Sequence, residues 1–150
     1  MKNSIQDFMM NIQASQIGLS SSTTPPVVLV VEDSADTLNM LCGKISAMGY
    51  SAIPAKNSQT ALKCLKFIAP DAILLDATSP GIGGLELGRK IRSMPAYANI
   101  PILFMIEQAN TRQIISSFEN GGTDYLPKPL RIPEVLARLT AHITTRIAAA

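Results

Sequence analysis

From Val27 onward, short β-branched and aliphatic runs alternate with segments whose apolar residues recur at helical spacing. The first run, residues 27–31, is apolar at every position, which is typical of a strand buried on both faces of a parallel sheet. Further strands are predicted over residues 50–55, 72–75, 100–106 and 124–126. Pro54 cannot donate a ladder hydrogen bond, so the second strand is expected at a sheet edge.

Amphipathic helices are predicted between and after these strands. The third of these helices is predicted over residues 85–93. The other four are recognised by their apolar stripes, in chain order: Leu38, Leu41, Cys42 and Ile45; Ala61, Leu62, Leu65 and Ile68; Ile114, Ile115 and Phe118; and Val135, Leu136, Leu139 and Ile143. Ser34 or Asp36 is the expected N-cap of the first helix, and Pro70 ends the second. Five such units with right-handed crossovers predict an α/β fold with a five-stranded doubly wound parallel sheet. We expect a flavodoxin-like three-layer α/β/α sandwich of strand order 2-1-3-4-5.

Residues 1–26 precede this alternating pattern and differ from it. Ile5, Phe8, Met9 and Ile12 form one stripe of a predicted amphipathic helix, and a Ser/Thr/Pro-rich linker follows. An amphipathic helix must bury its stripe, so we expect it to dock on the domain or on a neighbouring chain. The domain itself is predicted over residues 27–147, and residues 148–150 are interpreted as the start of a linker to an output module.

Composition and charge exclude several classes of protein. The net charge of +2 and the absence of tryptophan give no basis for nucleic-acid binding. No apolar run approaches the ~18 residues of a membrane span, and no signal peptide is evident, so a cytoplasmic location is expected. Cys42 and Cys64 fit no zinc spacing and are interpreted as small buried apolar residues.

Charged residues stand where the predicted strands end. Glu32 and Asp33 follow the first strand, Asp76 follows the third, and Lys128 follows the fifth. The carboxyl ends of parallel strands share one edge of the sheet, so these side chains should converge there. Carboxylates about 4 Å apart repel by about 4 kcal/mol at an effective dielectric of about 20, and binding a cation relieves this repulsion. An open site with oxygen ligands favours Mg²⁺.

The order and spacing of these residues resemble the receiver domain of two-component response regulators. Three motifs carry the resemblance: VVED at 30–33, LLDATSPGIGGLE at 74–86 and DYLPKP at 124–129. The likeness runs from Val27 to Ile143 and includes every expected element. The acid pair alone is a weak signal, whereas the turn after Asp76 together with Lys128-Pro129 is specific.

The resemblance implies a phosphoacceptor in a two-component phosphorelay. Asp76 would accept a phosphoryl group from a sensor-kinase histidine or a phosphotransfer protein. Asp33 and Asp76 would ligate Mg²⁺ directly, Glu32 through water, and Thr78 through its backbone carbonyl. Lys128 would pair with the phosphoryl oxygens, and a cis bond is expected before Pro129. The family also suggests a homodimer and no enzymatic activity beyond the domain's own phosphotransfer and dephosphorylation.

Ile106 is the most informative departure from the family pattern. The family places Thr or Ser there, and its hydroxyl donates a hydrogen bond to the phosphoryl group. A bond of that kind is worth about 1.5–3 kcal/mol. The next residue is Glu107, an additional acid, and Tyr125 occupies the position of an aromatic that turns inward when the hydroxyl moves. These residues motivate an alternative function: a degenerate receiver that acts as a constitutive protein-interaction module without a phosphorylation switch.

Two enzymatic or cofactor-binding alternatives have little support from the residues. A phosphohydrolase with an aspartate nucleophile usually carries a second acid two residues later, where this chain has Thr78. The glycines at 81, 83 and 84 lack the Gly-Lys-Ser/Thr ending of a nucleotide-binding loop. The acids at the strand ends would also repel the phosphate of a flavin.

Overall fold

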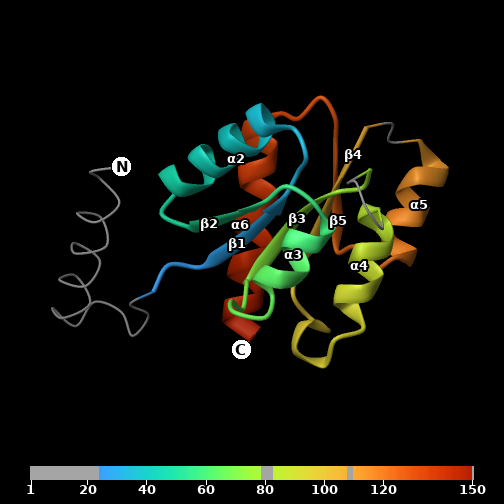
Figure 1. Cartoon of the computed structure of the whole chain (residues 1–150). Coiled ribbons are helices and arrows are strands. Elements are labelled where there is room, and N and C mark those ends of the chain that lie inside the picture. Colours follow the sequence, from blue (N-terminus) through green and yellow to red (C-terminus); the bar gives the residue numbers. More distant parts are fainter. Residues whose placement is uncertain (1–23, 79–82, 108–109, 150) are drawn as a thin grey trace, which may run out of the picture.

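A computed structural model describes residues 24–78, 83–107 and 110–149 of the chain. Five strands form a single parallel sheet in the order β2-β1-β3-β4-β5, so the predicted topology is confirmed (Figure 1). The strands are β1 (Val27–Val31), β2 (Ser51–Ala55), β3 (Ala72–Asp76), β4 (Ile102–Ile106) and β5 (Asp124–Pro127). The helices are α2 (Ala35–Ala47), α3 (Ser58–Cys64), α4 (Gly84–Arg92), α5 (Thr111–Glu119) and α6 (Ile132–Ala149), with a short 3₁₀ helix η1 (Pro95–Tyr97).

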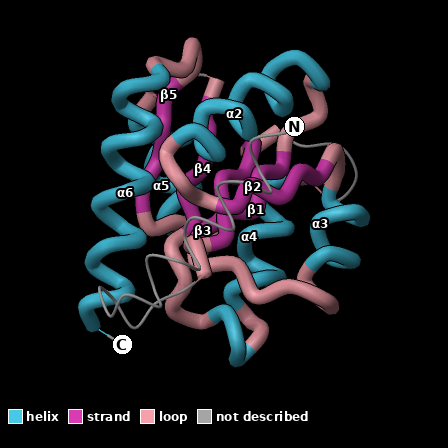
Figure 2. Tube along the Cα trace, turned by 90° about the vertical axis from the view of Figure 1, so that its left-hand side faces the viewer, coloured by secondary structure: helices cyan, strands magenta, loops and turns pink. Residues whose placement is uncertain are grey.

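Alternating side chains of the strands enter two apolar cores, one on each face of the sheet. Val30, Leu74 and Met105 point to the face covered by α2 and α6. Leu75 and Phe104 point to the opposite face, where α3 and α4 pack, and α5 covers the β4–β5 side (Figure 2). Both faces of the central strands are therefore buried, which explains why their sequences are continuously apolar.

Two predicted boundaries differ from the structure by two residues or more. Helix α3 ends at Cys64 and does not continue to Ile68, because the Lys66 and Phe67 amides bond three residues back. Tyr97 Oη also donates to the carbonyls of Leu65 and Ile68, at 2.9 and 3.2 Å. Strand β4 begins at Ile102 and not at Ile100. The Ile100 carbonyl instead accepts a hydrogen bond from Arg92 Nη1 at 2.6 Å.

Arg92 fastens the segments that lead into two neighbouring strands. Its guanidinium donates to the carbonyls of Tyr97, Ala98 and Ile100 before β4 and to the carbonyl of Gly121 before β5. Burial lowers the pKa of Arg92 from its ordinary value, although the group stays charged. These bonds fix the loops at the amino ends of β4 and β5, the end of the sheet opposite to its carboxyl end.

Several other expectations concern single residues. Ser34 is the N-cap of α2, as predicted, and its side chain accepts a bond from the Thr37 amide. Cys42 and Cys64 are free and only half-buried, each packing against one of the two cores. The predicted N-terminal stripe of Ile5, Phe8, Met9 and Ile12 lies outside the described residues. None of the described helices is long and apolar enough to span a bilayer.

Gly88 and Gly43 offer a matched test of this packing. A Cβ on Gly88 would lie 2.4 Å from the buried Phe104 ring, whereas a Cβ on the exposed helical Gly43 would meet nothing within 4 Å. We expect Gly88→Ala to lower the free energy of unfolding by about 1–3 kcal/mol through overpacking. Gly43→Ala should raise it by up to about 1 kcal/mol through helix propensity. Urea denaturation measures both, and equal effects of the two substitutions would contradict the packing described.

Candidate functional site

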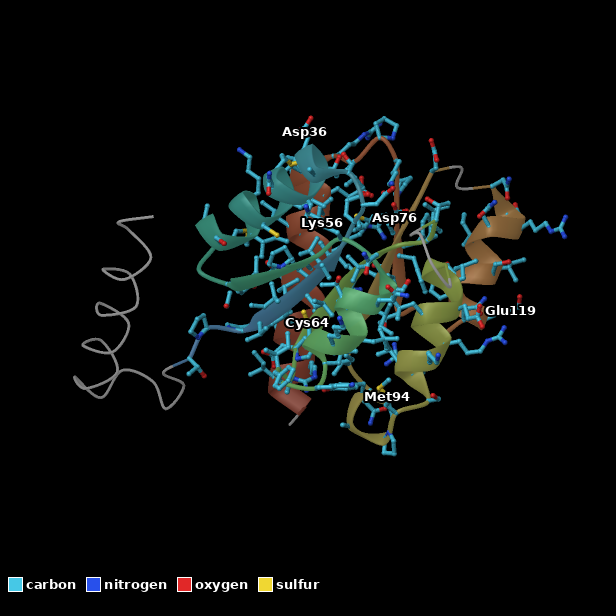
Figure 3. All side chains as sticks on the ribbon, viewed as in Figure 1. Asp36, Lys56, Cys64, Asp76, Met94 and Glu119 are labelled. Carbon is cyan, nitrogen blue, oxygen red and sulfur yellow. The ribbon has the colours of Figure 1, made fainter. Side chains whose placement is uncertain are left out.

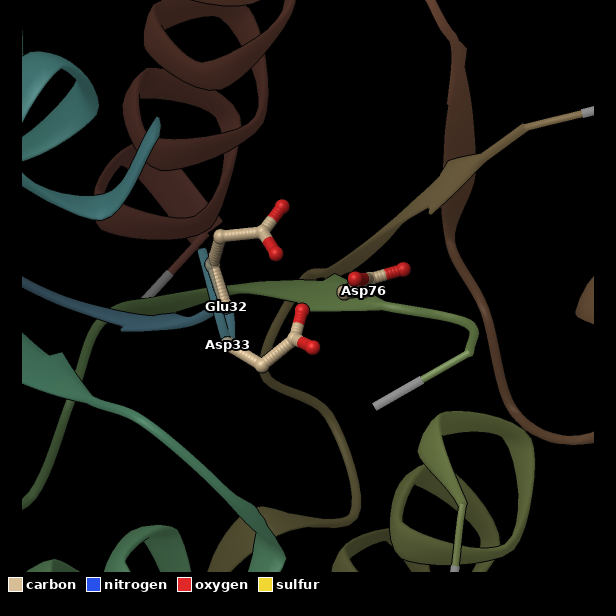
Figure 4. Close-up of side chains that lie close together, drawn as sticks. All are labelled: Glu32, Asp33 and Asp76. Carbon is tan, nitrogen blue, oxygen red and sulfur yellow. The ribbon is translucent and has the colours of Figure 1, made fainter. Parts of the chain in front are cut away.

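Three acidic side chains gather at the carboxyl end of the sheet. Glu32 and Asp33 directly follow β1, and Asp76 is the last residue of the neighbouring strand β3. Each contributes a carboxylate oxygen, and these oxygens all lie within 4.8 Å of one another (Figure 4). The parallel register of β1 and β3 therefore produces the convergence that the sequence predicts.

Glu32 is buried among negative groups. Its residue is only 2% exposed, as is Asp76, whereas Asp33 is exposed at the rim. The pKa of Glu32 is raised to about 7, chiefly by burial, and further by a hydrogen bond with the Asp33 side chain and by the charge of Asp76. The Ser34 amide, which donates to Glu32 Oε2 at 3.2 Å, and the Lys128 ammonium partly oppose this rise. Burial is therefore the main reason that the Glu32 carboxyl resists ionisation, and neighbouring acids add to it.

Lys128 supplies the positive charge that the sequence predicts there. Its Nζ lies 3.4 Å from Glu32 Oε1 and 3.3 Å from Asp76 Oδ2. Burial lowers the pKa of Lys128, but the carboxylates of Asp76 and Glu32 raise it by more, so the net pKa lies above its ordinary value. Its amide donates to the Ile106 carbonyl at 2.8 Å, which fixes the backbone beside β4. The Lys128–Pro129 peptide is cis, as expected.

Thr78 contacts Asp76 in a way that the sequence analysis missed. Its amide and its hydroxyl both donate to Asp76 Oδ1, at 3.1 and 3.0 Å. The carboxylate is thus held by Thr78 on one oxygen and faces Lys128 with the other. The spacing Asp-x-Thr is a known signal for such a local side-chain turn and would have indicated this contact.

Gly84 allows α4 to begin directly against the end of β3. A Cβ at this position would lie 1.8 Å from the Asp76 carbonyl oxygen. The Gly84 amide donates to the Ala77 carbonyl at 3.2 Å. Residues 79–82 lie outside the described part of the chain. The structural role of Gly84 is this close backbone approach.

Three residues named in the sequence analysis, Ile106, Glu107 and Tyr125, lie on or directly after strands β4 and β5. Ile106 is 2% exposed and packs in the core between the sheet and α3 and α4, while Glu107 is exposed. Tyr125 is half-buried, and its ring contacts Phe118 and Arg138 on the outer side of β5. Among the described residues, the Asp76 side chain accepts hydrogen bonds from Thr78 and pairs with Lys128.

The donor set suits a small hard cation. Three carboxylates offer oxygen ligands to one space, and one of them, Asp33, is open to solvent. Such a site, with few protein ligands and room for retained water, is typical of Mg²⁺. A divalent cation would also offset the charge that raises the pKa of Glu32.

Comparisons with known proteins agree with this geometry. Residues 28–140 match the sequence family described as "Response regulator receiver domain". The chain is 33% identical over 114 residues to the phosphate regulon transcriptional regulatory protein PhoB of Pseudomonas aeruginosa, covering 76% of this chain and 50% of that protein. It is 34% identical over 117 residues to the response regulator MprA of Mycolicibacterium vanbaalenii, covering 78% and 50%.

Solved structures show the same likeness. A two-component response regulator from Clostridium difficile superposes with a TM-score of 0.75 at 27% identity, covering 81% of this chain and 98% of that one. The chain spans about half the length of the curated relatives it matches. The similarity therefore concerns one domain of those proteins.

Asp33→Asn tests the metal site, with Asp36→Asn as its control. Asp36 is an exposed acid in the first turn of α2 and lies outside the cluster (Figure 3). Removing the Asp33 charge should weaken Mg²⁺ binding by about ten-fold or more, because ligand charge sets the affinity of such sites. Asp36→Asn should leave binding unchanged. Isothermal titration calorimetry measures both, and equal affinities for the two variants would contradict the assignment.

Proposed function

Because this chain belongs to the response regulator receiver domain family, we propose that it accepts a phosphoryl group on Asp76. The donor is a phosphohistidine of a sensor kinase or of a phosphotransfer protein. Receiver domains partner histidine kinases, and their family is one of signalling domains and not of catalytic enzymes. The same proposal places the chain in the cytoplasm together with its phosphoryl donor.

The transfer forms an acyl phosphate on the Asp76 carboxylate. A carboxylate oxygen attacks phosphorus, the P–N bond of the phosphohistidine breaks, and its electron pair leaves with the imidazole. This chemistry needs positioning and charge neutralisation more than covalent machinery. The observation that carries the proposal is the placement of Asp76 among Glu32, Asp33 and Lys128 at one end of the sheet.

Each residue around Asp76 has a separate task in this proposal. Thr78 fixes the carboxylate through its two hydrogen bonds to Oδ1. Lys128, 3.3 Å from Oδ2, would follow the negative charge onto the phosphoryl oxygens. Glu32, Asp33 and Asp76, with the Thr78 carbonyl, would hold Mg²⁺, which supplies further neutralisation of the transferring group when bound.

Asp76→Asn should abolish phosphorylation, because an amide is not a competent nucleophile for this transfer. Wild type incubated with Mg²⁺ and acetyl phosphate should gain a hydroxylamine-labile phosphoryl group, detected by phosphate-affinity electrophoresis. The control Asp36→Asn should be labelled like wild type. Persistent labelling of Asp76→Asn would place the modification on another residue and overturn the proposal.

Lys128→Gln should slow phosphorylation without removing the acceptor. Losing one pre-positioned charge at the phosphoryl group is expected to lower the rate by about 100-fold. Lys56→Gln is the matched control, since Lys56 is an exposed lysine just after the end of β2 (Figure 3). Initial labelling rates at saturating Mg²⁺ compare the two, after thermal unfolding shows that both variants are folded. Equal rates would remove Lys128 from the mechanism.

A further inference from the structure

Ile106 places an apolar side chain at the end of β4, beside the phosphoacceptor strand. The residue is 2% exposed and belongs to the apolar core that also contains Leu75 and Phe104. Its carbonyl is already used by the Lys128 amide. Its side chain has no hydrogen-bond donor for a phosphoryl oxygen on Asp76. The charge of a phosphoryl group therefore cannot pull on β4 through a hydrogen bond from the Ile106 side chain.

Tyr125 is held between two helices at the edge of the sheet. Its ring meets Phe118 of α5 edge-on, with centroids 6.3 Å apart and an interplanar angle of 88°. The Arg138 guanidinium of α6 lies over the ring, 6.0 Å from its centroid. The register places Tyr125 opposite Phe104, on the same side of the sheet as Ile106. An inward turn of the ring would break both contacts.

Arg138 is itself fixed by acids, so it cannot follow the ring freely. Its Nη1 donates to Asp124 Oδ1 at 2.9 Å, and its Nε lies 3.4 Å from Glu134 Oε1. His142 Nε2 lies 3.0 Å from Asp124 Oδ2, which ties the same aspartate to the next turn of α6. Asp124 begins β5, so these bonds join the start of that strand, directly before Tyr125, to α6.

We propose that the α5–β5–α6 surface, defined here by Ile115, Phe118, Tyr125 and Arg138, keeps one arrangement whether or not Asp76 is phosphorylated. Ile115, Phe118 and Arg138 are exposed to solvent and give this surface its apolar and cationic character. The inference rests on the proposed phosphorylation of Asp76 and departs from the conformational response that the family resemblance implies. A partner that distinguishes the phosphorylated chain must then contact the phosphoryl pocket itself.

Beryllofluoride with Mg²⁺ is the probe, applied to the full chain and followed by amide NMR and hydrogen exchange. In wild type, the amides of Thr78 and Lys128 should shift to saturation. Exchange rates in α5 and β5 should change by less than about two-fold. In Ile106→Thr, which restores a hydroxyl, those rates should change by about ten-fold or more. Ile106→Val has the shape of threonine without the hydroxyl and should behave like wild type.

Each outcome bears on a separate claim. A change of about ten-fold in α5 of wild type, absent in Asp76→Asn, overturns the fixed surface. A change of exchange rates in Ile106→Val equal to that in Ile106→Thr overturns the role of the missing hydroxyl. The absence of a change in both variants overturns it as well. If Thr78 and Lys128 do not shift in wild type, the phosphoacceptor function fails, and the fixed surface is then decided by a measurement that needs no adduct.

That measurement is the side-chain conformation of Tyr125 in the ligand-free protein. Three-bond couplings of wild type should report a single χ1 rotamer, with ring contacts to Phe118. Averaging between two rotamers would overturn the inference. Phe118→Ala removes one side of the clamp and should introduce such averaging, whereas Ile115→Ala, an exposed neighbour on the same helix, should not.

Discussion

Repulsion among Glu32, Asp33 and Asp76 is the constraint on which the functional end of this domain depends. The parallel pairing of β1 with β3 brings the three carboxylates within 4.8 Å of one another. Two carboxylates about 4 Å apart repel by about 4 kcal/mol at an effective dielectric of about 20. Lys128 offsets part of this charge, while burial, the hydrogen bond with Asp33 and the charge of Asp76 together raise the pKa of Glu32 to about 7. A site in this condition favours binding of a cation.

The rest of the fold keeps that cluster in place. Two apolar cores hold the strands in place. Arg92 fastens the loops at the ends of β4 and β5 that lie opposite the acidic cluster. Glycines at 84 and 88 let α4 approach β3 and Phe104 more closely than any larger residue would allow. Thr78 then holds one Asp76 oxygen while the other faces Lys128. The charged groups are thus positioned by rigid elements before any phosphoryl group arrives.

Different interactions hold the outer edge of the sheet at β5. Tyr125 is restrained by an aromatic contact from α5 and a cationic contact from α6, and ion pairs anchor that cation to β5. Ile106 lies between this edge and the acidic cluster without a polar group on its side chain. These contacts are the basis of our proposal that phosphoryl chemistry at Asp76 and the shape of the α5–β5–α6 surface are separable properties.

The sequence determined the fold class because each strand and helix is encoded by local periodicity: the apolar run at 27–31 and the stripe through Leu38 and Leu41 needed no tertiary information. It also determined which charged residues meet, since the parallel topology gathers the strand ends. The end of α3 at Cys64 and the start of β4 at Ile102 were decided by tertiary hydrogen bonds from Tyr97 and Arg92. The environment of Tyr125 was likewise decided by packing, because Phe118 and Arg138 reach it from the helices that precede and follow β5. Local periodicity records which face of an element is apolar, whereas side chains from distant segments become neighbours only when the sheet and its helices are assembled.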